Sequence, residues 1–196
     1  MPLSPAPTDE IYEKYRDKAI LEINALADEI ARAARGRVPV LGSGHPLGDI
    51  LLLKYRPQPA EVQEGVAFYG RSGQAIIKSL QRLRVDPLSI YGTNCLKFAG
   101  EADAEARSFL MRELHVVQPK LIVVMGEDAL RFLNELEFPL ADTLNEKVGE
   151  LQRFTPTIEA LLVPDIDASL DEQPAKTRFW NAFKQLGPWW AELPPY

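Results

Sequence analysis

The side chains whose types most often carry chemistry are few in this sequence. Cys95 is its only cysteine, and His45 and His115 are its only histidines. One cysteine cannot form an internal disulfide or an all-cysteine metal site, and the two histidines lack metal-ligand spacing. Since nothing near Cys95 in the sequence would lower its pKa, we expect a small buried core thiol. These residues predict neither a metal site nor a cysteine nucleophile.

A glycine-rich segment at residues 42–48 reads Gly-Ser-Gly-His-Pro-Leu-Gly. Its spacing is not that of a dinucleotide-binding fingerprint, and it precedes a predicted strand instead of following one. The sequence also contains no Walker lysine motif. We therefore interpret this segment as a turn.

The elements that would position a site alternate between strands and helices. Apolar runs predict strands at residues 50–55, 88–93, 121–125 and 160–163. Helical spacing of apolar residues predicts helices at residues 73–84, 102–117, 128–136 and 173–186. This alternation predicts a three-layer α/β/α sandwich around a central four-stranded parallel sheet.

A long helix precedes these elements. Apolar residues recur every three or four positions from Ile11 to Ala34, and Gly36 ends the pattern. We expect an N-terminal tail and docking helix over residues 1–36, an α/β domain over residues 37–190 and a C-terminal tail over residues 191–196.

Ligands of parallel sheets bind outside the carboxyl ends of the strands. In this sequence that rule selects the long loop expected at residues 56–72 and the positions following Asn94, Gly126 and Val163. A long loop after a buried strand is often functional.

Composition narrows the class of protein. No apolar run approaches the ~20 residues that a membrane span needs, and no secretory signal is visible, so we expect a cytoplasmic protein without membrane association. The net charge of −6 argues mildly against non-specific nucleic-acid binding. A local basic patch would still permit it, and a solvated mixed face is the alternative. The candidate patch residues are Lys54, Arg56, Arg71, Lys78, Arg82 and Arg84.

Three segments resemble, in order and spacing, motifs of the iron–sulfur-bearing, family-4-like uracil-DNA glycosylases. Residues 65–73, Gly-Val-Ala-Phe-Tyr-Gly-Arg-Ser-Gly, look like G-x-P-F-V-G-x-A-G. Residues 90–97, Ile-Tyr-Gly-Thr-Asn-Cys-Leu-Lys, look like V-Y-I-T-N-V-V-K, and residues 119–129 are similar to P-x-x-I-V-x-L-G-x-x-A. The resemblance runs from about residue 38 to residue 186.

This resemblance implies recognition of a uracil that is flipped out of DNA into a pocket. It implies that Phe68 stacks on the base and that Asn94 hydrogen-bonds its edge, since an amide offers both a donor and an acceptor. Taken alone, Phe68 could be a core aromatic and Asn94 a turn residue. Arg71, Lys78 and Ser169 are the expected contacts to DNA, and we expect a monomer.

Two of the family's catalytic positions are replaced. The motif G-E-x-P-G falls on residues 54–58, where Tyr55 stands in place of the acid. The motif H-P-S falls on residues 167–169, where Asp167 stands in place of the histidine and would repel charge developing on uracil. Losing one such contact costs about 2.7–4 kcal/mol. Glu61, Glu64 and Asp165 are candidate substitute carboxylates, although solvated loop charge is the favoured interpretation.

The cysteines that would hold the family's cluster are also absent, and Phe98 stands where one belongs. We therefore expect no iron–sulfur cluster, no metal and no other cofactor. Tyr55, Asp167 and Glu61 remain the candidate catalytic residues.

The expected function is recognition of a flipped, uracil-like base in single- or double-stranded DNA, of the base-excision-repair type, with catalysis weak or lost. If active, the protein is a DNA N-glycosylase. The alternatives are a non-catalytic member that binds nucleic acid or a nucleobase, and a protein-interaction domain that reuses the fold.

Overall fold

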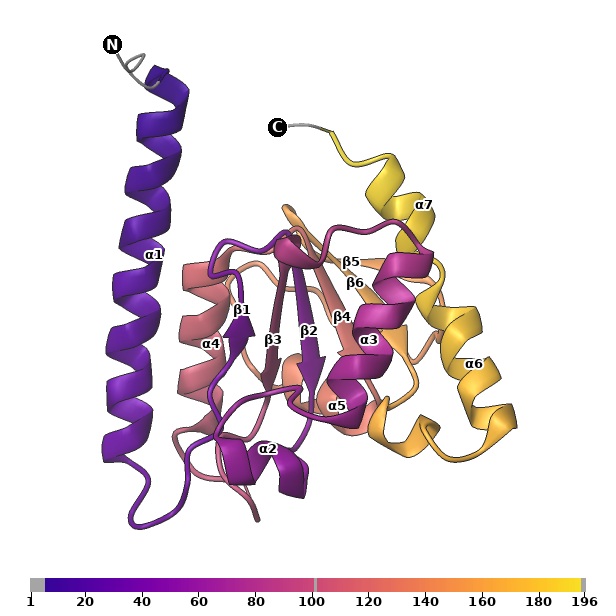
Figure 1. Ribbon diagram of the computed structural model, residues 1–196, viewed down its shortest axis with the longest axis horizontal. Helices are drawn as coiled ribbons and strands as arrows, with labels where there is room; N and C mark the ends of the chain where they lie inside the picture. Colours follow the sequence, from indigo (N-terminus) through magenta and orange to yellow (C-terminus); the bar gives the residue numbers. More distant parts are fainter. Residues whose placement is uncertain (1–5, 101, 195–196) are drawn as a thin grey trace.

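The computed structural model describes residues 6–100 and 102–194 (Figure 1). The outer parts of the two expected tails, residues 1–5 and 195–196, lie outside the described residues. Four parallel strands form the middle of the sheet in the spatial order β3 (Ile90–Asn94), β2 (Ile50–Lys54), β4 (Leu121–Met125) and β6 (Ile158–Val163). The predicted four-stranded parallel sheet is confirmed as this central part.

Two antiparallel edge strands extend the sheet to six. Strand β1 (Ser43–Gly44) pairs with β3, and β5 (Leu151–Thr155) pairs with β6. Residues 42–48 therefore contain the expected turn, at residues 46–47, and also an edge strand that the sequence did not predict. Edge strands are short and partly exposed, so neither produces the continuous apolar run that marks the central strands.

Helices cover both faces of the sheet (Figure 1). One face packs against α3 (Arg71–Arg82), α6 (Gln173–Phe183) and α7 (Leu186–Ala191). The other packs against α4 (Ala106–Val117) and α5 (Glu127–Asn134). Side chains of a strand alternate between these two cores: Ile50 and Leu52 enter the first, and Leu51 and Leu53 enter the second. The predicted three-layer α/β/α architecture is confirmed.

The long helix α1 (Pro7–Arg32) lies outside α4 (Figure 1). Its second half docks, because Leu26 and Ile30 join a small core with Phe98 and Phe109. The predicted apolar stripe continues toward the N-terminus, but Ile11 is 56% exposed there. No helix among the described residues has the length and apolarity needed to cross a membrane.

The segment expected to be a long loop at residues 56–72 contains a short helix, α2 (Pro59–Glu64). Pro59 occupies the first turn, where its fixed φ and missing N–H are harmless. Gly65 ends the helix at φ 72°, in the left-handed region that glycine adopts readily. The helix sets the position of Glu61 beneath the carboxyl ends of β2 and β3.

Candidate functional site

The last residues of β2 and β3 form the floor of the site. Lys54 and Asn94 are direct register partners on these parallel strands. Both side chains lie on the α3 face of the sheet, because they continue the alternation of Leu52 and Ile90. Both residues are also buried, and Lys54 is only 1% exposed. The expectation that Lys54 belongs to a surface basic patch is therefore wrong.

The carboxylate of Glu61 joins three segments of the chain. Its Oε2 accepts hydrogen bonds from Lys54 Nζ at 2.6 Å and from the Gln58 amide at 2.7 Å. Its Oε1 accepts from the Phe68 amide at 2.6 Å and from Asn94 Nδ2 at 3.2 Å. Glu61 has no exposed surface, so the interpretation of this residue as solvated loop charge is wrong.

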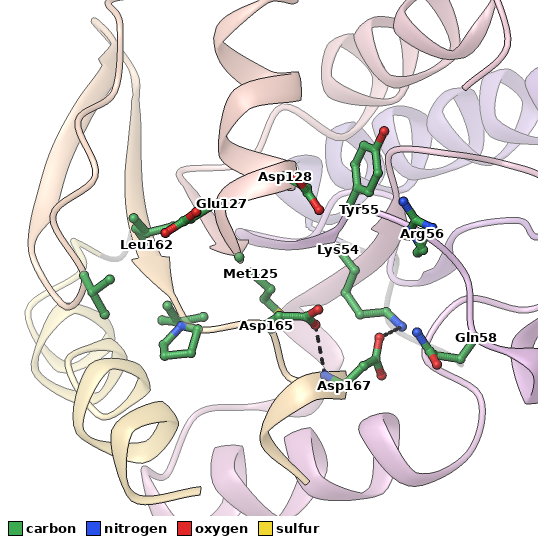
Figure 2. Close-up of a pocket in the computed structure, with 14 residues that line it drawn as sticks. Lys54, Tyr55, Arg56, Gln58, Met125, Glu127, Asp128, Leu162, Asp165 and Asp167 are labelled. Atoms are coloured by element: carbon green, nitrogen blue, oxygen red, sulfur yellow. Dashed lines mark hydrogen bonds and ion pairs between the residues drawn. The ribbon is translucent and has the colours of Figure 1, made fainter. Parts of the chain in front are cut away.

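The ammonium group of Lys54 also contacts Asp167, whose Oδ2 accepts a hydrogen bond from Lys54 Nζ at 2.9 Å (Figure 2). Burial raises the pKa of the Asp167 carboxyl above its ordinary value, and the bond from Lys54 offsets only part of this effect. The negative charges of Asp165 and Glu61 raise it further. One ammonium thus serves two carboxylates, and the pKa of the Asp167 carboxyl stays above its ordinary value.

Phe68 is held in a conformation that few non-glycine residues adopt, with φ at 61°. A Cβ atom at Gly92 would lie 2.7 Å from the Phe68 ring, and one at Gly73 would lie 1.9 Å from its carbonyl oxygen. The ring therefore depends on two glycines for its position. Lys54 Nζ lies 5.0 Å from the ring centroid, within the range of a cation–π contact. Strained backbone of this kind is frequent at ligand sites.

Asn94 carries an unused acceptor. Its Oδ1 is buried and has no hydrogen-bond partner among the described residues. The amide orientation is fixed by Glu61, because exchanging the two atoms would place Oδ1 against a carboxylate oxygen. An unsatisfied buried acceptor costs about 1–3 kcal/mol, and it is an atom that a ligand donor could satisfy.

A cavity of about 440 Å³ opens at the carboxyl ends of β2, β4 and β6 (Figure 2). Its lining includes Lys54, Tyr55, Asp165 and Asp167, together with the turn at Gly126. Phe68 and Asn94 are not among the residues that line this cavity. The predicted site is therefore divided: Tyr55 and Asp167 line this cavity, whereas Phe68, Asn94 and Glu61 do not.

Tyr55 points away from the other predicted site residues (Figure 2). Since it follows Lys54, it faces the opposite core, where its ring meets Phe132 edge-on at a centroid distance of 6.3 Å. The guanidinium of Arg56 lies 5.2 Å from the Tyr55 ring centroid. Tyr55 reaches the cavity without approaching Asp167 or Phe68.

The three predicted DNA contacts differ in accessibility. The Arg71 side chain is 68% exposed and pairs with Asp171 at 2.8 Å, and Lys78 is exposed on the same helix. Ser169 is buried, and its Oγ donates to the backbone oxygen of Asp165 at 2.7 Å. Arg71 and Lys78 are thus exposed to solvent, whereas Ser169 is buried and fixes the loop that carries Asp167.

A second buried ionic cluster, which the sequence reasoning missed, lies on the other face of β3. Lys97 Nζ donates to Thr93 Oγ1 at 2.7 Å, to the backbone oxygen of Asn94 at 2.6 Å and to the carboxylate of Glu113. Glu113 also accepts a hydrogen bond from the Tyr91 hydroxyl at 2.7 Å. Burial raises the pKa of Tyr91, and the neighbouring charge of Glu113 raises it further. Lys97 thereby fixes the backbone that presents Asn94. The signal in the sequence that could have revealed this cluster is the position of Lys97 inside an apolar run.

The residues present do not fit an iron–sulfur cluster. Cys95 is the only cysteine, it is fully buried, and burial raises the pKa of its thiol. Phe98 is 2% exposed and packs against Leu26 and Ile30, and the Arg37 guanidinium lies 4.0 Å from its ring centroid. Apolar packing fills the position where the resemblance expects a cluster ligand.

Comparisons with known proteins agree with this architecture. A model of the uracil DNA glycosylase superfamily matches residues 41–186. A type-4 uracil-DNA glycosylase of Archaeoglobus fulgidus is 24% identical over 159 residues, which cover 76% of this chain and 80% of that protein. Because the family model covers the whole sheet, helices α2 to α6 and every residue of the site, the chain belongs to the uracil-DNA glycosylase superfamily.

Proposed function

We propose that this uracil-DNA glycosylase-like protein binds DNA at the carboxyl edge of its sheet, and that it excises uracil weakly or not at all. In this proposal Phe68 and Asn94 recognise a base. The observation that carries it is the free Oδ1 of Asn94, a buried acceptor close to an aromatic ring that is held in a strained conformation. The imide N–H of a uracil-like base is a donor of the kind that this acceptor lacks.

The replaced positions support weak catalysis. The Lys54 ammonium is shared between two carboxylates, so little of its charge is left to offset negative charge on a departing base. Asp167 adds negative charge or, when protonated, supplies none. Two missing transition-state contacts, each worth about 2.7–4 kcal/mol, would slow excision by roughly 10⁴-fold or more.

Glu61 is the remaining candidate base, and its contacts argue for a positioning role. Its two oxygens already accept four hydrogen bonds, from two side chains and two backbone amides. Each of its oxygens already accepts two hydrogen bonds, so no acceptor position is left for a water molecule. We propose that Glu61 orders Phe68 and Asn94 and does not activate water.

The test measures binding and base release separately. Binding of uracil-containing single-stranded DNA is followed by fluorescence anisotropy at several salt concentrations, and release of free uracil by chromatography. We expect salt-dependent binding, a preference for uracil that Asn94→Ala abolishes, and little release. Absence of DNA binding at low salt would refute the proposal, and rapid release of uracil or another damaged base would refute its catalytic part.

The exposed half of α1 favours a second candidate, in which the fold serves as a protein-interaction domain. Ile11, Tyr15 and Leu21 are 56%, 64% and 70% exposed on this helix. A co-purifying protein that is lost in the variant Ile11→Lys/Tyr15→Lys, together with absent DNA affinity, would select this function over base recognition.

A further inference from the structure

We infer that Lys54 fills the base pocket from inside and determines whether a base can reach Phe68 and Asn94. This inference rests on the proposed function, because it assumes that these two side chains face a base. It adds the residue that controls admission to the site, and nothing in the protein's resemblance to its family supplies a lysine at this position.

The register of the sheet puts Lys54 in the way. Lys54 and Asn94 are direct partners on neighbouring strands, which lie about 4.8 Å apart, and their side chains share one face. The Lys54 ammonium lies 5.0 Å from the Phe68 ring centroid. A stacked base would lie about 3.5–4 Å above that ring. The lysine and a stacked base therefore compete for one space.

The lysine is fixed in this place by its charge. Its Nζ binds Glu61 at 2.6 Å and Asp167 at 2.9 Å; the contact with Glu61 is shielded from water, and the Asp167 side chain is 12% exposed. Lys54 and Asp167 line the open cavity, and Phe68 and Asn94 do not. Lys54 is therefore the residue that both lines this cavity and contacts the Phe68 ring.

Entry of a base would require Lys54 to leave both carboxylates. Its departure would strand the charge of Glu61, which has no exposed surface. A glycine at this position, which is the residue of the motif that resembles 54–58, has no side chain to block the space above Phe68. We therefore expect the wild-type chain to bind free uracil more weakly than a chain with glycine at position 54, because in the wild type the base must first displace Lys54.

The experiment compares two double variants that differ only in the side chain at position 54. Lys54→Gly/Glu61→Gln opens the pocket and also removes the carboxylate that would otherwise be left unpaired. Lys54→Met/Glu61→Gln makes the same change in charge but keeps a side chain of similar length. Binding of free uracil is measured by calorimetry and by NMR shifts of the Asn94 side-chain amide.

We expect the glycine variant to bind uracil at least about tenfold more tightly than the methionine variant. The wild-type chain should behave like the methionine variant, and adding Asn94→Ala to the glycine variant should abolish the gain. Equal affinities of the two double variants for free uracil, or a wild-type affinity as high as that of the glycine variant, would overturn the inference. Lys54→Ala/Glu61→Gln replaces the glycine variant should the latter not fold.

Binding of single-stranded DNA, measured in the same proteins, separates the two claims. A glycine variant that gains uracil binding while no form binds DNA would support the inference and refute the proposed function. DNA binding by the wild type with no difference between the glycine and methionine variants would do the reverse.

Discussion

Lys54 and Asn94 hold opposite oxygens of one carboxylate. Lys54 Nζ donates to Oε2 of Glu61 at 2.6 Å, and Asn94 Nδ2 donates to Oε1 at 3.2 Å. The same two oxygens accept the backbone amides of Gln58 and Phe68. The position of every recognition residue therefore depends on a carboxylate that has no contact with water.

Replacing Glu61 with alanine should destabilise the protein by about 3–5 kcal/mol, because a buried ammonium then keeps only Asp167 as a partner. Unfolding in urea measures the change. The control is Glu64→Ala, an exposed carboxylate of the same helix, which should stay within about 0.5 kcal/mol of wild type. A loss below about 1 kcal/mol for Glu61→Ala would mean that the cluster is not fixed as described.

Asp167 should make stability fall as pH rises. Its folded-state pKa is raised above the ordinary value of 3.8, so the folded state binds more protons than the unfolded state. The carboxyl group therefore favours folding below its ordinary pKa, and this advantage is lost as pH rises through the folded-state value. Asp167→Asn, which mimics the protonated form, should gain stability relative to wild type over that range. Melting temperatures measured from about pH 4, close to the ordinary carboxyl pKa, up to about pH 8 test this. A constant difference between the two proteins would contradict it.

Lys97 should behave as one partner of a buried pair. Lys97→Met leaves Glu113 charged among apolar neighbours and should cost about 3–5 kcal/mol. The double variant Lys97→Met/Glu113→Leu removes both charges and should recover most of this loss, although the Tyr91 hydroxyl then lacks its acceptor. Urea unfolding of both proteins gives the comparison. A double variant that is less stable than Lys97→Met would show that Glu113 contributes chiefly as the acceptor of the Tyr91 hydroxyl.

Arg71 and Lys78 lie seven positions apart, which places them on one side of α3 two turns apart. If they meet DNA phosphates, each alanine substitution should lower the slope of log affinity against log salt by about 0.7 for single-stranded DNA. Arg107→Ala is the matched control, because Arg107 is also exposed and ion-paired but lies on α4. Equal slopes in all three variants would place the DNA elsewhere.

The central strands and α3 could be predicted because their apolar spacing records burial directly. The environment of Lys54 could not, because its carboxylate partners lie 7 and 113 residues away in the chain. A lysine at the end of an apolar strand carries no mark in the sequence that distinguishes a buried ion pair from a solvated charge. The three-dimensional position of Asp167 decides between them.

The misassigned loop has a different cause. Pro59 and Gly65 interrupt apolar periodicity and therefore predict irregular backbone, yet they are the first residue and the C-cap of α2. Between them only one helical turn and a half is available, too short for a repeating pattern. Residues that end helices are easily read as residues that prevent them.

The packing around Phe98 has a practical consequence for handling the protein. Where the family's motif expects a ligand to an inorganic cluster, this chain has a hydrocarbon ring clasped between α1 and α4. The fold at this position therefore does not depend on assembling an iron–sulfur cluster without oxygen, and it holds no cluster sulfide that oxygen could attack. We therefore expect protein prepared in air to stay folded at this position. The colour or iron content of a preparation would not measure how much of the protein is intact.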